Sequence, residues 1–103
     1  MYNLVMDIKF KAKLWQWQGK DSWHFITIPP EFSEEIKLIG DSHKKGFGSV
    51  KVEVTIGNCT WRTSVFPDAK AKSYLLPIKK EIRSKESLED GISAKVAVKL
   101  MEV

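Results

Sequence analysis

Residues 25–31 read Phe-Ile-Thr-Ile-Pro-Pro-Glu, and residues 74–81 read Tyr-Leu-Leu-Pro-Ile-Lys-Lys-Glu. In both stretches a short apolar segment runs into proline and is followed by charged residues mixed with apolar ones. Proline gives a sheet no hydrogen-bond donor and presets the backbone angle of a first helical turn. The repeat therefore predicts two similar strand–turn–helix units in one fold, tied together by β-hairpins.

The two helices of these units are predicted to be short. The first is predicted over residues 31–39, where Phe32 and Ile36 share one face, with Gly40 as its C-cap. Three glutamates in this first unit suit the positive start of a helix. The second helix is predicted to open at Pro77 and to run for about two turns.

Alternation of apolar and polar residues predicts the remaining strands. Residues 50–56 and 59–66 alternate on either side of Gly57-Asn58, a pair typical of a two-residue hairpin turn, and Pro67-Asp68 is predicted to end the second of these strands. Residues 94–100 alternate in the same way and predict the final strand.

Near the N-terminus, residues 8–14 alternate as well. The pattern slips at Leu14-Trp15, which indicates a bulge or a strand end at the rim of a sheet. Counting all the patterns gives six or seven strands and two short helices. The predicted fold class is mainly β, a small closed or nearly closed β-barrel that leaves few exposed sheet edges.

Composition limits the class of protein. The chain has 103 residues, 43% of them hydrophobic, and a formal net charge of +4. We expect one β-barrel domain over residues 1–103. The single cysteine, Cys59, excludes an internal disulfide, and no stretch resembles a signal peptide or a membrane span of about 20 apolar residues. We therefore expect a cytoplasmic protein that does not associate with membranes.

Residues suited to catalysis or metal binding are scattered. His24 and His43 have no neighbouring partner for a triad, and Ser64 is not in a Gly-x-Ser-x-Gly turn. No cluster of cysteine, histidine and aspartate has metal-ligand spacing. We expect no catalytic residue, no metal site and no cofactor, and so a protein that is not an enzyme.

Positive charge gathers in the second unit. Six cations and one acid, Glu81, lie between Lys70 and Lys85. On a helix Lys79, Lys80 and Arg83 would share one side and could hold a phosphate group, with Arg62 nearby. The alternative is a solvated face whose cations form salt bridges with Glu81, Glu86 and Glu89.

Four tryptophans are many for so short a chain. Exposed beside lysines they would form a stacking platform for single-stranded nucleic acid; buried, they would belong to the barrel core. Trp15 and Trp17 fall on the polar face of their strand, so we expect them to be partly exposed. The candidate binding residues are Lys79, Lys80, Arg83, Arg62, Trp15 and Trp17.

Two family resemblances follow from these motifs. Residues 76–83, Leu-Pro-Ile-Lys-Lys-Glu-Ile-Arg, resemble the Pro-Lys-x-x-Arg unit of swapped-hairpin transition regulators, which are dimers. Over nearly the whole chain the sequence resembles domain of unknown function 1905. The matching stretches are Phe10-Lys11-Ala12-Lys13-Leu14, Trp23 to Pro29, Thr63-Ser64-Val65-Phe66-Pro67 and residues 76–83.

The second resemblance implies a small β-barrel with no established activity. In other chains such domains are often fused to a domain related to bacteriocin-protection proteins, whereas we expect this one to stand alone, as a bacterial-type monomer or weak homodimer. The leading hypothesis is a non-enzymatic binding or interaction module of unknown partner. The alternatives are binding of nucleic acid by the basic, tryptophan-flanked surface and binding of a small ligand in the barrel mouth.

Overall fold

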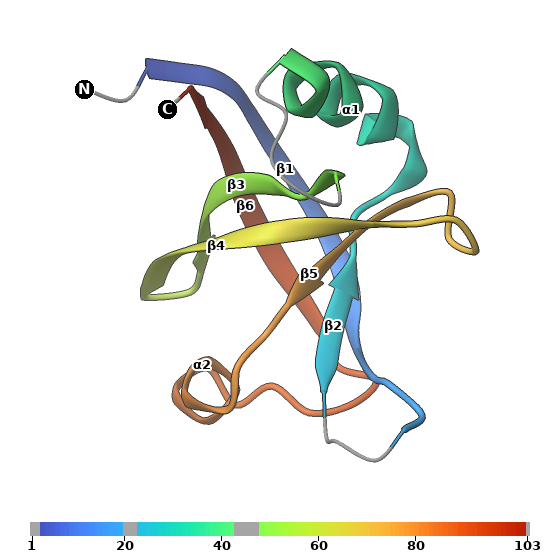
Figure 1. Cartoon of the computed structure of the whole chain (residues 1–103). Helices are drawn as coiled ribbons and strands as arrows, with labels where there is room; N and C mark the ends of the chain where they lie inside the picture. The colour runs from blue at the N-terminus through green and yellow to red at the C-terminus, as the bar shows by residue number, and fades with distance from the viewer. Residues whose placement is uncertain (1–2, 20–22, 43–47, 103) are drawn as a thin grey trace.

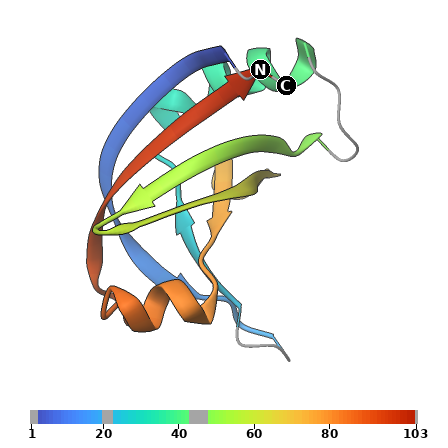
Figure 2. The same ribbon diagram turned by 90° about the vertical axis from the view of Figure 1, so that its left-hand side faces the viewer.

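The computed structural model describes residues 3–19, 23–42 and 48–102. Within these ranges six antiparallel strands close into a barrel in the order β1-β2-β5-β4-β3-β6 (Figures 1 and 2). The strands are β1 (Asn3–Gln16), β2 (His24–Thr27), β3 (Val50–Ile56), β4 (Cys59–Asp68), β5 (Ser73–Pro77) and β6 (Ser93–Glu102). The helices are η1 (Pro30–Phe32), α1 (Ser33–Ser42) and α2 (Lys80–Lys85). The predicted mainly β barrel with two short helices is confirmed.

The core fills the barrel with aliphatic side chains, because every second residue of each strand points inward. Fully buried side chains come from β1, β2, β3, β4, β5, β6 and α1; they include Leu14, Ile26, Val54, Val65, Leu76, Val98, Leu100 and Ile36. No helix in the described part of the chain is long and apolar enough to cross a membrane.

The hairpin of β3 and β4 forms as predicted. Seven residue pairs run from Val50 opposite Val65 to Ile56 opposite Cys59. Gly57 has a φ of +57°, a left-handed value that glycine adopts without steric cost. β4 ends at Asp68, at the predicted Pro67-Asp68 pair, but both residues belong to the strand, since Pro67 lies opposite Tyr74 and Asp68 opposite Ser73 on β5.

At the end of β1 the pairing is regular. Leu14, Trp15 and Gln16 lie opposite Ile26, Phe25 and His24 with no shift of register. The break in the pattern is therefore the predicted strand end and not a bulge. The register change of β1 lies near its start, between Leu4 and Met6.

The two strand–proline–helix units lie side by side. Ile26 on β2 lies opposite Leu76 on β5, and the pairing extends on both sides of this pair. Ile28 donates its N–H to the carbonyl oxygen of Tyr74, and Ile78 donates to that of His24, both at 2.9 Å. Because the paired strands are antiparallel, the helices that follow them lie at opposite ends of the barrel (Figure 1).

This pairing corrects the predicted start of the second helix. The ladder continues past Pro77 to Ile78, so α2 begins at Lys80, after an extended Lys79. The first helix also differs from its prediction. The prolines produce a 3-10 turn, η1, before α1, which then passes through Gly40 to Ser42. His43 lies outside the described residues.

Candidate functional site

The barrel wall opens between β4 and β5, because β5 leaves β4 after Leu75 while it stays paired with β2 through Pro77. β4 has ten residues and β5 has five. Their register covers Phe66 to Asp68 against Leu75 to Ser73, whereas residues 59–65 of β4 pair with β3. On this first half of β4, Trp61 and Thr63 are half-buried and border the uncovered edge.

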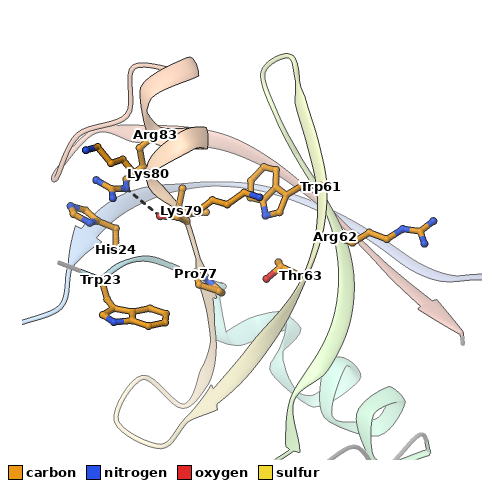
Figure 3. A pocket seen from close by; sticks show the side chains of 10 residues that line it. Trp23, His24, Trp61, Arg62, Thr63, Pro77, Lys79, Lys80 and Arg83 are labelled. Carbon is orange, nitrogen blue, oxygen red and sulfur yellow. Dashed lines mark hydrogen bonds between the residues drawn. The ribbon is translucent and has the colours of Figure 1, made fainter. Parts of the chain in front are cut away.

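A pocket of about 370 Å³ lies where β5 ends. Pro77 forms part of its floor, Trp61 and Thr63 line it from β4, and Trp23 and His24 line it from the start of β2 (Figure 3). Segments from three distant parts of the sequence therefore meet at one concavity. We call it the basic pocket.

The remaining side of the basic pocket carries cations. Lys79, the N-cap residue of α2, and Lys80 and Arg83 of the helix line it. Arg83 donates a hydrogen bond from Nε to the carbonyl oxygen of Ile78 at 3.2 Å, and the Lys79 side chain extends toward Trp61 (Figure 3). No carboxylate is among the described residues that line the pocket, so these cations give it a positive potential.

Arg62 is among the residues that line the pocket, but its guanidinium points away from it (Figure 3). The guanidinium Nε lies 3.7 Å from Oε2 of Glu53, on the neighbouring strand β3. The reason is the alternation of β4, which turns Arg62 outward between the half-buried Trp61 and Thr63. The structure thus brings Lys79, Lys80 and Arg83 together and leaves the Arg62 guanidinium outside.

Trp15 does not line the basic pocket but is connected to it through the rings of Phe25 and Trp23. Its indole N–H donates to Oγ1 of Thr27 at 2.9 Å, and its ring centroid lies 5.3 Å from that of Phe25. The Phe25 ring is in turn stacked with Trp23, which lines the pocket, at 6.1 Å and 15°. Trp17 is exposed, as expected, but it does not line the pocket.

The two tryptophans of the pocket itself, Trp23 and Trp61, were not among the predicted binding residues. Trp23 is 52% exposed because it precedes the first paired residue of β2. No local signal in the sequence marks Trp61, because its place at the pocket depends on which strands lie next to β4 in the barrel.

The other basic residues of the second unit do not join the pocket. Lys70 and Lys72 lie in the turn between β4 and β5, at the far end of β5 from α2 (Figure 1). Lys85 forms the i,i+4 pair with Glu81 that the alternative interpretation predicted, at 3.4 Å.

Glu86, at the end of α2, contacts the β3–β4 turn. Its Oε2 accepts hydrogen bonds from the Asn58 N–H at 3.3 Å and the Cys59 thiol at 3.4 Å. Partial burial raises the pKa of the Cys59 thiol, and the hydrogen bond to Glu86 and the charge of that carboxylate raise it further. Within the described ranges no group of three or more His, Cys, Asp or Glu residues is placed to hold a metal ion.

The comparisons with known proteins identify a family. The model of the domain of unknown function 1905 (DUF1905) matches residues 10–98, which include every strand of the barrel in whole or in part and the entire basic pocket. The chain therefore belongs to this family. No curated protein matches the sequence.

Proposed function

We propose that the protein is a non-enzymatic, cytoplasmic binding module that takes a phosphate-bearing ligand with a planar ring in the basic pocket. One observation carries the proposal: Lys79, Lys80 and Arg83 line one pocket of about 370 Å³ together with two tryptophans, Trp23 and Trp61. Ammonium and guanidinium groups are the usual partners of phosphate oxygens, and an indole face stacks on planar rings.

The size of the pocket supports a small occupant or one unit of a larger one. Ligand pockets usually have volumes of about 300 to 1,000 Å³, so this one is at the small end. Its polar contacts would come from side chains of α2 and its apolar contacts from Trp23, Trp61 and Pro77. A mononucleotide has a phosphate group for the polar contacts and a planar base for the apolar contacts.

The experiment is a calorimetric titration with thymidine monophosphate at low ionic strength. The variant Lys79→Ala/Lys80→Ala removes two pocket charges, and Lys37→Ala/Lys70→Ala is its control. The control residues are exposed and lie on α1 and on the β4–β5 turn, away from the pocket. We expect saturable binding by the wild type and the control and at least a tenfold weaker affinity in the pocket variant, since each charged hydrogen bond contributes about 1.5 to 3 kcal/mol. Equal affinities in the two double variants, or no saturable heat with the wild type, would reject the proposal.

A further inference from the structure

A second group of cations lies on the outer wall of the barrel. Lys9, Lys11 and Lys13 follow one another on the outward face of β1, and Lys95 lies on β6 directly opposite Lys11. We call these four exposed residues the lysine patch. The surface between Lys9, Lys11 and Lys95 is hollowed, with a volume of about 440 Å³. Like charges directly opposite each other destabilise a sheet, so the fold gains nothing from the Lys11–Lys95 pair.

The neighbouring row of the same wall shows how this charge could have been balanced. There Asp7 lies opposite Lys99, Lys99 opposite Glu53, and Glu53 opposite Arg62, so that charge alternates across β1, β6, β3 and β4. On β6, by contrast, Ala97 lies opposite Lys9, Lys95 opposite Lys11 and Ser93 opposite Lys13. In the described part of the chain no carboxylate lies within salt-bridge distance of its four ammonium groups.

A row of aromatic rings connects the lysine patch with the basic pocket. Trp15 follows Lys13 by two residues on the same face of β1, about 7 Å along the strand. From Trp15 the row passes to Phe25 at 5.3 Å and to Trp23 at 6.1 Å, and Trp23 lines the pocket. We call Trp15, Phe25 and Trp23 the aromatic row. Cations thus lie at both of its ends.

We propose that the phosphate-bearing ligand is a single-stranded nucleic acid that runs from the basic pocket over the aromatic row to the lysine patch. This inference rests on the proposed function of the pocket. Bases stack on exposed aromatic side chains while cations contact the phosphates on either side, and such stacking requires bases that are not paired in a duplex. A small barrel covers about 4 to 16 nucleotides, which is compatible with a path across three adjacent strands.

The experiment measures fluorescence anisotropy of a labelled oligothymidine of about 12 nucleotides. The test variant is Lys11→Ala/Lys95→Ala, which leaves the basic pocket intact, and Lys37→Ala/Lys70→Ala is the control with the same change of charge. We expect the test variant to bind the oligonucleotide at least threefold more weakly than the control at low salt. We also expect it to lower the slope of log affinity against log salt by about 1.4, or about 0.7 per lost phosphate contact.

Three further readings decide the inference. Thymidine monophosphate should bind the test variant and the wild type equally, because the monophosphate occupies only the pocket. A duplex of the same length should bind more weakly than the single strand. Trp23→Ala should weaken binding of the oligonucleotide, since stacking contributes about 1 to 3 kcal/mol per base.

The inference is overturned if Lys11→Ala/Lys95→Ala binds the oligonucleotide as tightly as the control, or if the duplex binds as tightly as the single strand. In either case saturable binding of thymidine monophosphate leaves the proposed function of the pocket standing. If the wild type binds neither the monophosphate nor the oligonucleotide, both proposals fail together.

Discussion

Arg83 and Ile78 are joined by a hydrogen bond of 3.2 Å, from the guanidinium Nε to a carbonyl oxygen at the end of the β5 pairing. Ile78 is itself fixed, because its N–H donates to the carbonyl oxygen of His24 on β2. The Arg83 guanidinium is thereby held against the end of β5, at the edge of the basic pocket. Arg83 is for this reason the best-positioned cation of the three in α2 and its cap.

Two substitutions of Arg83 distinguish the contribution of its charge to ligand affinity from that of its hydrogen-bonding geometry. Lysine keeps the charge but loses the Nε donor and the fork of guanidinium N–H groups, so Arg83→Lys should bind thymidine monophosphate roughly threefold to tenfold more weakly. Arg83→Ala should be weaker again. Calorimetry measures both affinities, and urea unfolding should show each variant within about 1.5 kcal/mol of the wild type, the usual net contribution of one hydrogen bond. Full affinity in Arg83→Lys would mean that the anchoring bond has no role in binding.

Gly57 in the β3–β4 turn should resist substitution. Its φ of +57° is costly for a residue with a Cβ, and that Cβ would collide with the carboxylate at the end of the flexible Glu86 side chain, which would have to move aside. Gly57→Ala should lower the free energy of unfolding by about 1 to 3 kcal/mol, measured by urea denaturation. The control is Gly91→Ala, at a φ of +88° with nothing within 4 Å of the new Cβ, which has the backbone cost without the collision. An unchanged stability in Gly57→Ala would contradict the geometry of this turn.

The pKa of the Cys59 thiol predicts its reactivity. The pKa is raised, so less thiolate is present at pH 8 than in the unfolded chain, and iodoacetamide should alkylate the folded protein more slowly. Glu86→Gln keeps an acceptor oxygen but removes the negative charge, so the pKa should fall and the reaction should speed up. Equal rates in Glu86→Gln and the wild type would show that the carboxylate does not act on the thiol.

The same shift has a consequence for stability. A thiol whose pKa is higher in the folded state stabilises the fold at neutral pH, below its unfolded pKa. That contribution declines as the pH rises from the unfolded pKa through the folded one. Urea unfolding at pH 7 and at alkaline pH should therefore show that the rise in pH lowers the free energy of unfolding less in Cys59→Ser than in the wild type.

Replacement of Lys95 should stabilise the barrel. Lys95→Glu would turn the like-charge pair with Lys11 into an opposite-charge pair, which should raise the free energy of unfolding by about 0.2 to 1 kcal/mol at low salt. Lys70→Glu, in the exposed β4–β5 turn, is the control with the same change in net charge. The gain should shrink at high salt. A gain in the free energy of unfolding no larger than that of Lys70→Glu would show that repulsion between Lys11 and Lys95 does not destabilise the barrel.

Local patterns in the sequence predicted the barrel class and the central residues of its strands, but not all of their ends. Alternation along β3, β4 and β6 depends on which face of each strand is buried, and Gly57 marks the hairpin turn. Helix starts were harder to predict. Pro77 suits a first helical turn and also the last residue of a strand, and its pairing with Phe25, far away in the sequence, decides between them.

One part of the candidate site was predictable from the sequence, the part that local spacing determines. Lys79, Lys80 and Arg83 are near one another in sequence, so their clustering follows from local spacing. Trp23 precedes β2 and Trp61 lies on β4, and the two line one pocket only because β5 leaves β4 after Leu75. Such a meeting depends on the order of the strands around the barrel, which no local pattern contains.

The most direct measurement for the central claim is a two-dimensional ¹H–¹⁵N NMR titration of the protein with thymidine monophosphate. Binding in the basic pocket predicts saturable shifts of the indole N–H signals of Trp23 and Trp61 and of the backbone signals of residues 77–83. Signals of α1 and of the β4–β5 turn should stay in place. Shifts confined to α1 or the turn, or no saturable shifts at low ionic strength, would contradict a ligand site in the basic pocket.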